Sequence, residues 1–229
     1  ASTSIAATPG HFSVGTYTGT GSATTVGHGL GGIPEMIIIK NRSSGSTSTA
    51  DWVVGASTRG SDFTDYGHLD TTGSFGDLNT KWNDTDPTAN VFTIGTHNRV
   101  NKASDNYVFY AFRSVPGVCS VGSYEGNNNA DGTFVNLGFK PAWVMTKTID
   151  ATGAWGIYDS KRDPDNPVQQ RLFADANSTE DTDGEQMDFL SNGFKLRKTG
   201  GHNNNNQTYL YLAMAEIAPN GAYPPIYGR

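Results

Sequence analysis

Polar and hydrophobic positions alternate with a period of two at the start of two stretches of the chain. In FSVGTY, which begins at Phe12, the side chains of Phe12 and Val14 point to one side of an extended backbone, and those of Ser13 and Tyr17 to the other. Nearly the same letters recur 107 positions later, in CSVGSY. We predict a strand at the start of each half of the chain.

Short hydrophobic runs separated by turn residues predict the other strands. The runs 36–39 and 143–145 are apolar at almost every position, which is typical of central strands buried on both faces. Long aromatic strands are expected to close the two halves, at 107–112 and 209–214. Asn- and Gly-rich turns separate the runs. Shorter strands are expected at 51–54, 91–94, 155–158 and 194–196.

Composition favours the same kind of fold. The 28 Gly residues suit tight turns, and each would cost roughly 1 kcal/mol inside a helix. One stretch departs from this pattern, because residues 168–183 contain neither Gly nor Pro, and Val168, Leu172 and Phe173 would share a helical face. We predict one or two helical turns there. The predicted fold class is all-β, with two tandem homologous β-sandwich-like domains and little helix.

The two halves of the chain are similar over nearly their whole length. Residues 13–40 align with 120–147 without a gap, and ten of the 28 positions are identical. The similarity continues with small length changes, so that Trp52 matches Trp155. We infer a tandem duplication of one β domain of about 105 residues. The expected parts are an N-terminal extension at 1–10, a first repeat domain at 11–116, a second repeat domain at 117–217, and a Pro/Tyr tail at 218–229.

Both ends of the chain lie outside the repeats. The tail PNGAYPPIYGR cannot form a helix, and it either stays solvated or lies across a neighbouring subunit through Tyr223, Ile226 and Tyr227. The first ten residues are small and polar, lack the basic segment and apolar core of a signal peptide, and begin with Ala. We expect a processed product or a fragment of a longer chain.

Charge and hydropathy narrow the range of partners. The net charge is −6 and the 16 basic residues are scattered, whereas duplex-binding proteins cluster Lys and Arg. We therefore expect no nucleic-acid partner and no attraction to anionic membranes. No apolar run approaches the roughly 20 residues of a membrane span. Cys119 is the single cysteine and forms no internal disulfide, so we expect a small buried apolar side chain.

Catalytic and metal-binding motifs are not found. The five His residues lack metal-site spacing, and the Gly-rich stretch 15–21 lies between two strands, with no helix N-terminus after it to hold a phosphate. Acidic loops at 159–166 and 180–185 offer oxygen ligands for calcium, but neither fits the calcium-loop pattern, so solvated loops are expected. We predict no metal, no cofactor and no enzymatic activity.

Two charged positions are shared between the halves. Lys40 matches Lys147, and Arg59 matches Arg162. We expect each of these side chains to pair with a carboxylate in its own half, and binding of an anionic ligand is the alternative.

Loops with aromatic and amide side chains suggest a sugar site. Such sites combine an aromatic platform with planar hydrogen-bonding groups. Trp82, in the polar stretch NTKWNDTD, is the best single candidate, although a Trp that covers the edge of the core is the simpler interpretation. The candidate ligand-binding residues are Tyr66, His68, Trp82, His97, Arg99 and His202, with Asp77 and Asn79 in the same loop as Trp82.

The order of these motifs resembles a known family. It runs from GTYTGTG at Gly15 and GLGGIP at Gly29, through a strand that ends in KNRS and a lone Trp52, to the closing aromatic strand. This order resembles the repeat domain of tail-fibre and other virion proteins of tailed bacteriophages, especially marine ones. The resemblance implies a structural or adsorption role on a virus particle, and it supplies no catalytic residues. The second half departs from it in EGNNNADG, which replaces the Gly-rich turn.

We therefore expect a non-enzymatic virion protein of a bacteriophage, in a tail fibre or a capsid-surface appendage, with exposed loops that attach to the host surface. Its partners would be other virion proteins and copies of itself, because sheet edges must be covered, and a host-surface glycan would be a further ligand. A carbohydrate-binding module or adhesin is the first alternative. A polysaccharide depolymerase is the second, and it would need two carboxylates or a Tyr/His pair in a cleft.

Overall fold

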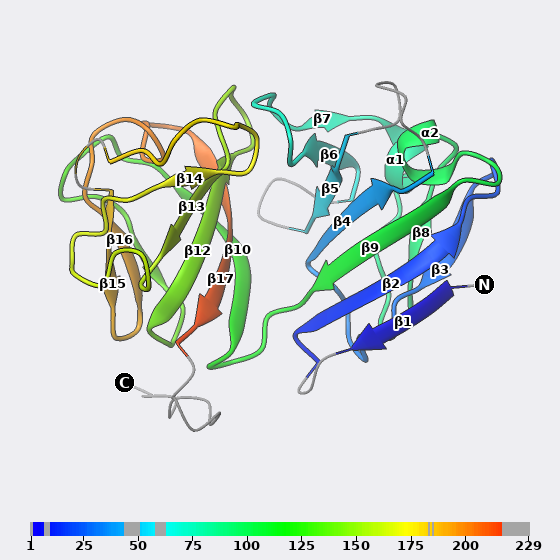
Figure 1. The fold of residues 1–229 in the computed structure, drawn as a ribbon, viewed down its shortest axis with the longest axis horizontal. Helices are drawn as coiled ribbons and strands as arrows, with labels where there is room; N and C mark the ends of the chain where they lie inside the picture. The colour runs from blue at the N-terminus through cyan, green and yellow to red at the C-terminus, as the bar shows by residue number, and fades with distance from the viewer. Residues whose placement is uncertain are drawn as a thin grey trace. The chain divides into compact units, whose positions relative to one another are not determined.

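The computed structural model divides the chain into two compact units between Ser114 and Val115, close to the predicted boundary after residue 116. Nearly all of the regular structure is β, and the strands pair antiparallel (Figure 1). The predicted all-β, sandwich-like fold class is confirmed. The described residues are 2–6, 10–43, 51–57, 63–182, 184 and 186–216.

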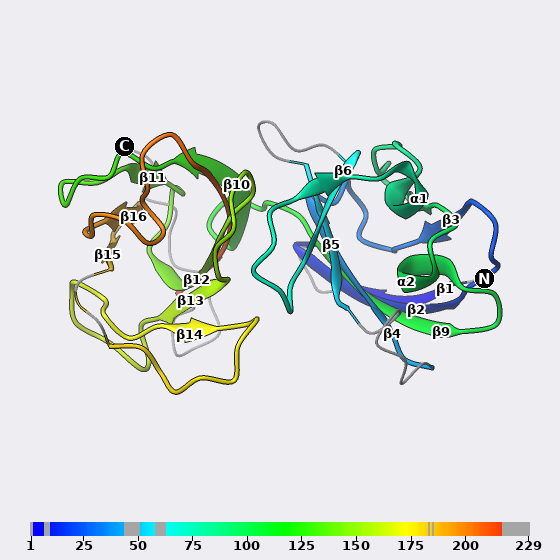
Figure 2. The ribbon, with the colours of Figure 1, turned by 90° about the horizontal axis from the view of Figure 1, so that it is seen from above.

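The first unit is built on a seven-stranded sheet in the order β1-β2-β9-β4-β5-β6-β7. A two-stranded sheet of β3 and β8 and two single-turn helices cover one face of it (Figure 2). The core between these layers contains Tyr17, Phe92, Tyr107 and Phe109. The elements are β1 (Ser2–Ala6), β2 (Phe12–Thr18), β3 (Thr24–Gly27), β4 (Met36–Asn41), β5 (Val53–Ala56), β6 (Asp65–His68), β7 (Gly76–Asp77), α1 (Asn79–Trp82), β8 (Val91–Ile94), α2 (Asn98–Asn101) and β9 (Asn106–Phe112).

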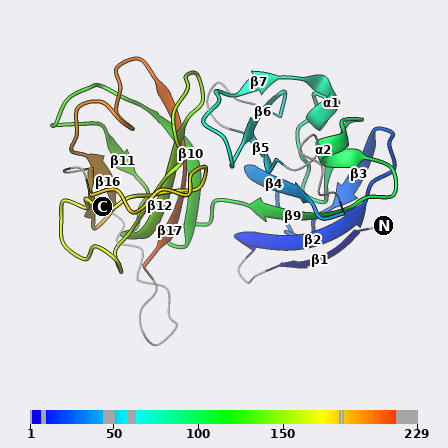
Figure 3. The same cartoon turned by 45° about the horizontal axis from the view of Figure 1, so that its top comes forward.

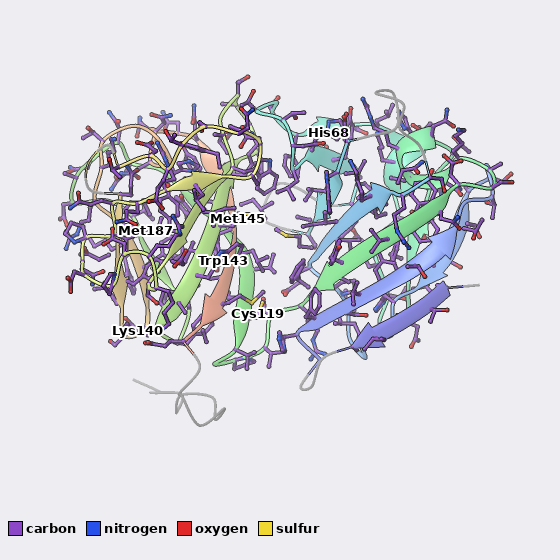
Figure 4. All side chains as sticks on the ribbon, viewed as in Figure 1. His68, Cys119, Lys140, Trp143, Met145 and Met187 are labelled. Carbon is purple, nitrogen blue, oxygen red and sulfur yellow. The ribbon has the colours of Figure 1, made fainter. Side chains whose placement is uncertain are left out.

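The second unit is a sandwich of a five-stranded sheet, in the order β10-β17-β12-β13-β14, and a three-stranded sheet, in the order β11-β16-β15. Its core contains residues of both sheets, such as Tyr209 and Tyr211 of the first and Phe194 and Met187 of the second. Figure 4 labels Met187. The elements are β10 (Cys119–Glu125), β11 (Phe134–Asn136), β12 (Pro141–Thr148), β13 (Gly156–Asp159), β14 (Leu172–Phe173), β15 (Met187–Leu190), β16 (Gly193–Leu196) and β17 (Thr208–Ala215).

The strands with continuous apolar runs are central, as predicted. β4 pairs with β9 on one side and β5 on the other, and Met36, Ile37, Ile38 and Ile39 are all buried. In the second unit, β12 lies between β17 and β13. Cys119, in β10, is buried as expected. Apolar residues on both faces of a strand are stable only where both faces are covered, which explains the run in the sequence.

The two units share a strand order and a register. The order β2-β9-β4-β5-β6 in the first unit corresponds to β10-β17-β12-β13-β14 in the second. Tyr17 pairs with Tyr107 across β2 and β9, and Tyr124 pairs with Tyr209 across β10 and β17. These are the residues that align in the sequence. The shared topology supports our inference that the units arose by duplication.

A buried asparagine closes the same end of each unit. In the first, the side-chain oxygen of Asn101 accepts the backbone N–H of Thr20 at 2.7 Å, and its amide donates to the carbonyls of Ser22 and Gly95. Asn203 makes equivalent bonds in the second unit, to Asn127 and Asn129 of the EGNNNADG loop and to the carbonyl of Lys198. The backbone of the Gly-rich turn is therefore bonded to the protein's own asparagine, which supports a structural role and not phosphate binding.

The helix predicted within residues 168–183 is wrong. Val168 forms a β-bridge with Met187, and Arg171 forms one with Asp181. Between them, Leu172 and Phe173 form β14, which pairs with β13. These backbone hydrogen bonds to other segments take the groups that a helix would bond internally, so tertiary pairing overrides the local pattern. The described helices are α1 and α2, on the same side of the first unit's sheet as β3 (Figure 3).

The N-terminal segment is part of the first unit. Residues Ser2–Ala6 form β1, which pairs with β2 in a register that sets Ser2 opposite Tyr17 and Ala6 opposite Ser13. We had expected an extension outside the repeat. The alternation in STSIA suits an edge strand, but it is too short and too polar to be recognised without its partner. The predicted tail, residues 218–229, lies outside the described residues.

Candidate functional site

Four of the six candidate residues lie together in the first unit. Tyr66, His68, His97 and Arg99 surround Lys81, which the sequence analysis did not single out. With Asp51 they form what we call the Lys81 cluster: Asp51, Tyr66, His68, Lys81, His97 and Arg99. Figure 4 labels His68 beside β6, at the end of the unit where this cluster lies.

Short elements bring these side chains together. Tyr66 and His68 are two residues apart on β6, so they project from the same face, and their rings lie 5.3 Å apart. Lys81 lies on α1, and His97 is the N-cap of α2, where its Nδ1 accepts the backbone N–H of Arg99 at 3.1 Å. The cluster therefore draws on three separate elements and the segment before β5.

Tight backbone contacts hold α1 against the segment that leads into α2. The N–H of Gly95 donates to the carbonyl of Lys81 at 2.8 Å, and the N–H of His97 donates to that of Thr80 at 2.9 Å. A Cβ at Gly95 would lie 2.3 Å from the Thr80 oxygen, so only glycine fits at this approach. This packing sets the distance between Lys81 and His97.

Lys81 is buried without a carboxylate partner among the described residues. Its side chain is 0% exposed. Its Nζ lies 3.3 Å from Nδ1 of His97 and 4.7 Å from the centre of the Tyr66 ring, in a cation–π arrangement. Burial and the nearby positive charge of Arg99 lower the pKa of Lys81 to about 7, against a smaller opposing effect of Asp51. A substantial share of Lys81 is therefore neutral at neutral pH.

Both histidines of the cluster are neutral. Burial, followed by the charge of Lys81, lowers the pKa of His68 and of His97 to about 4. Because Nδ1 of His97 accepts a hydrogen bond from Arg99, its proton lies on Nε2. Nδ1 of His68 lies 3.6 Å from a carboxylate oxygen of Asp51. A neutral imidazole has one hydrogen-bond donor and one acceptor, so the cluster contains both kinds of group.

Asp51 and Arg99 form the ion pair of the cluster. The Nη2 atom of Arg99 lies 2.7 Å from Oδ2 of Asp51, and the Arg99 side chain is 25% exposed. The Nε atom of Arg99 is buried and has no hydrogen-bond partner among the described residues. A guanidinium has five N–H donors, so part of its capacity remains for a ligand.

Trp82 belongs to the core, as the simpler interpretation had it. Its side chain is 0% exposed. It packs edge-on against Phe63, with ring centres 5.2 Å apart, and fills the space above Gly55, where a Cβ would lie 2.5 Å from the indole. Asp77 and Asn79 are exposed, and neither has a hydrogen bond or ion pair with the cluster. An indole in this position cannot stack on a sugar.

His202 is a core residue of the second unit. It occupies the position that Val100 has in the first unit, and Nδ1 lies 2.7 Å from the hydroxyl of Thr146. Its side chain packs over Gly156, where a Cβ would lie 2.8 Å from the imidazole. Burial lowers the pKa of His202 to about 3. It lies in the other unit from the Lys81 cluster and is bonded within the core.

The charged positions shared by the halves have different contacts. The Nζ atom of Lys40 lies over the Trp52 ring at 5.3 Å, and that of Lys147 donates to the carbonyl of Gly153 at 2.7 Å. Arg162 pairs with Asp159 and Glu180 in its own half, as expected. Arg59 lies outside the described residues. No group of three acidic, His or Cys side chains in the described ranges is arranged to hold a metal ion.

Comparison with known proteins identifies a family. One family model matches residues 1–218, and its description is a domain of unknown function (DUF7483). The chain belongs to this family. A comparison with curated proteins and one with solved structures each found no match. Within the described part of the chain, no helix is long and apolar enough to cross a membrane.

Proposed function

We propose that this member of the DUF7483 family is a non-enzymatic structural protein of a bacteriophage particle, in a tail fibre or a capsid-surface appendage. The proposal begins from the motif order, which resembles the repeat domain of tailed-phage virion proteins. An all-β body of two similar units is compatible with such a role. Assembly through β surfaces would be its main activity, and loops at the ends of the units would contact the host.

One observation carries the non-enzymatic part of the proposal: what the units share is scaffold. Stacked tyrosines and the buried asparagine that closes the end of the sheet occur in both units. The Lys81 cluster does not recur, because strand pairing places Arg171 where the first unit has Tyr66. Packing residues therefore recur in both units, which is compatible with a mechanical role.

Self-association is part of the proposal. β1 pairs with β2 on one side, and no described strand pairs with its other side. Ile5 on this edge strand is 75% exposed, and the strand carries no charge or Pro that would block pairing with another chain. We expect a homo-oligomer, which light scattering coupled to size exclusion would measure. A chain that stays monomeric at all concentrations tested would contradict the proposed self-association.

Mass spectrometry of purified particles tests the particle role directly. The measurement is the copy number of this chain in virions of the phage that encodes it. A small copy number would indicate a tail fibre, and a large one would indicate a capsid appendage. Absence of the chain from purified virions, although it is expressed during infection, would overturn the proposal.

A carbohydrate-binding role is the second candidate, and the Lys81 cluster favours it. Two imidazoles, a guanidinium and a tyrosine ring are grouped at one place, as in many sites that bind sugars. A glycan array with the purified chain would test it. Conversion of host capsule into shorter fragments by the purified chain would instead favour the depolymerase alternative.

A further inference from the structure

The Lys81 cluster holds a buried lysine that has no carboxylate within ion-pair distance among the described residues. Lys81, His68, His97 and Arg99 are the basic members, and Asp51 lies within ion-pair distance of His68 and Arg99. Lys81 is bonded to His97, not to an acid. In most buried ion clusters the charges are balanced, because an uncompensated buried charge is costly.

No acid in the described part of the chain is paired with Lys81. Asp70 is close enough to influence His68, but its Oδ1 accepts the backbone N–H of Trp52 at 3.1 Å. Asp51 already accepts from Arg99 at 2.7 Å. An anion from outside would therefore find a half-satisfied guanidinium and, near it, a buried amine that is paired with no described carboxylate.

Two members of the cluster are exposed to solvent. Arg99 is 25% exposed and His68 is 15% exposed, whereas Lys81 is fully buried. The Tyr66 ring, which is half-buried, lies close to both Lys81 and His68. An aromatic face beside cationic donors suits a ligand that has both a ring with C–H groups and an oxyanion.

We propose that the Lys81 cluster binds an acidic sugar, with the carboxylate or phosphate of the sugar on the exposed part of Arg99 and its ring against Tyr66. Arg99 would donate from the exposed part of its guanidinium, and the buried Lys81 would supply the second positive charge. His68 and His97 would bond the sugar's hydroxyls as neutral imidazoles. That the anion is part of a sugar is inferred from the proposed host-surface role. The inference that the cluster binds an anion does not depend on that role.

Anion binding must be coupled to protonation of Lys81. A bound oxyanion favours the charged amine, so binding takes up a proton wherever free Lys81 is partly neutral. With a pKa of about 7, free Lys81 is about nine-tenths protonated at pH 6 and about one-tenth at pH 8, which gives about tenfold tighter binding at pH 6.

The two histidines of the cluster do not titrate in that range. His68 and His97 stay neutral, because their pKa values are about 4. The remaining charged or titratable groups that face Lys81 and His68 are Asp51, Asp70, Tyr66 and Arg99. A pH dependence of binding in this range would therefore report on Lys81.

Isothermal titration calorimetry of the whole chain tests the proposal. D-glucuronate is the main probe, because its carboxylate stays charged from pH 6 to 8; glucose 6-phosphate, D-glucose and inorganic phosphate are the other probes. We expect glucuronate or glucose 6-phosphate to bind, D-glucose not to bind, and glucuronate affinity to rise about tenfold from pH 8 to pH 6. At pH 7, titrations in two buffers should show uptake of about half a proton.

Substitutions assign the effect to the cluster. Arg99→Gln should weaken binding at least tenfold at both pH values, and Lys81→Met should remove the pH dependence and the proton uptake. Lys147→Met is the matched control, because Lys147 is a buried lysine of the second unit with a lowered pKa, and it should leave binding unchanged. Near-ultraviolet circular dichroism would show that each variant is folded; if Lys81→Met is not, Arg99→Gln carries the test.

Several results would overturn the inference. Absence of glucuronate and glucose 6-phosphate binding at about 10 mM ligand would do so, as would equal affinity for D-glucose. Inorganic phosphate binding as tightly as the sugar phosphate would show an anion site that does not recognise a sugar. If the sugar acids bind but purified virions lack the chain, the particle role falls and the binding site stands.

Discussion

Tyr17 stacks on Tyr107 with ring centres 4.9 Å apart and planes 7° apart, and both hydroxyls bind the segment of α2. That of Tyr17 donates to the carbonyl of Val100 at 2.6 Å, and that of Tyr107 to the carbonyl of Asn98 at 2.7 Å. The pair links the neighbouring strands β2 and β9 to α2, at the end of the sheet. The second unit repeats the arrangement with Tyr124 and Tyr209, at 5.1 Å and 12°.

Removal of one of these hydroxyls should destabilise the unit that contains it. Tyr17→Phe leaves the carbonyl of Val100 buried without a partner, so we expect a loss of about 1–2 kcal/mol in the free energy of unfolding. Tyr124→Phe should have a similar effect on the second unit. Urea denaturation followed by circular dichroism measures both. Tyr110→Phe is the control, because this hydroxyl makes no hydrogen bond within the described residues, and an equally large loss there would contradict the argument.

The buried asparagine should be more sensitive than the tyrosine hydroxyl. Asn101→Ala leaves the N–H of Thr20 and the carbonyls of Ser22 and Gly95 without their partner, so we expect a loss of about 2–4 kcal/mol. Asn101→Asp keeps the acceptor but removes both donors, and it should not rescue stability. Thermal unfolding would measure both variants. Wild-type stability of Asn101→Ala would show that water replaces these bonds.

Two glycines of the first unit should respond to alanine for different reasons. At Gly15 a Cβ would lie 2.4 Å from the ring of Phe109 and 2.6 Å from the carbonyl oxygen of Thr3, so Gly15→Ala should cost about 1–3 kcal/mol and loosen β1. Gly31 has a φ of +73° and open space, so only backbone strain of about 1–2 kcal/mol applies. The rate of hydrogen exchange at β1 should rise in Gly15→Ala but not in Gly31→Ala. An equal rise in both variants would contradict the different causes proposed for the two glycines.

Trp82→Ala should act through folding and not through a ligand. The substitution removes a fully buried indole from between Phe63 and Gly55, which should cost about 3–5 kcal/mol. Denaturant unfolding would show the loss, and Trp82→Phe should recover part of it. Loss of sugar binding in a folded Trp82→Phe variant would contradict our assignment of Trp82 to the core.

His202 should make the second unit sensitive to acid. Its pKa is about 3 in the folded chain and near 6.5 when unfolded, so between these values the unfolded state binds more protons. The contribution of His202 to stability is therefore complete above about pH 6.5 and is lost as the pH falls toward 3. His202→Gln should flatten this part of the stability profile. Measurement of the free energy of unfolding at several pH values tests this prediction. If its slope against pH is unchanged in His202→Gln, the acid sensitivity comes from other residues, such as His68 and His97.

Much of the fold could be predicted from local patterns. The apolar runs in β4 and β12 and the aromatic runs in β9 and β17 mark central strands, because residues buried on both faces must be apolar at successive positions. The repeated SVG-x-Y segment marked β2 in the first unit and β10 in the second. Short elements such as β1, β7 and β14 were missed, since their stability comes from partners that are remote in the chain.

The candidate site was predicted only in part. Tyr66, His68, His97 and Arg99 were chosen for their chemistry, and the fold brings them together. Lys81 was overlooked beside Trp82, because a Lys in a polar stretch is normally a solvated charge. In the structure, the single-turn helix α1 buries the side chains of both Lys81 and Trp82. No signal in one sequence distinguishes a buried lysine from an exposed one before the packing of α1 is known.

The amino-acid sequence by itself determined the class of fold, the order of the main strands and the similarity of the two halves, because these depend on the spacing of apolar and turn residues along the chain. Only the tertiary structure decided which polar residues meet. The Lys81 cluster joins residues up to 48 positions apart, from Asp51 to Arg99, and their distances depend on how strands pair and how α1 and α2 pack. Packing also decides which of two adjacent side chains is an ionisable group in a cluster and which is core.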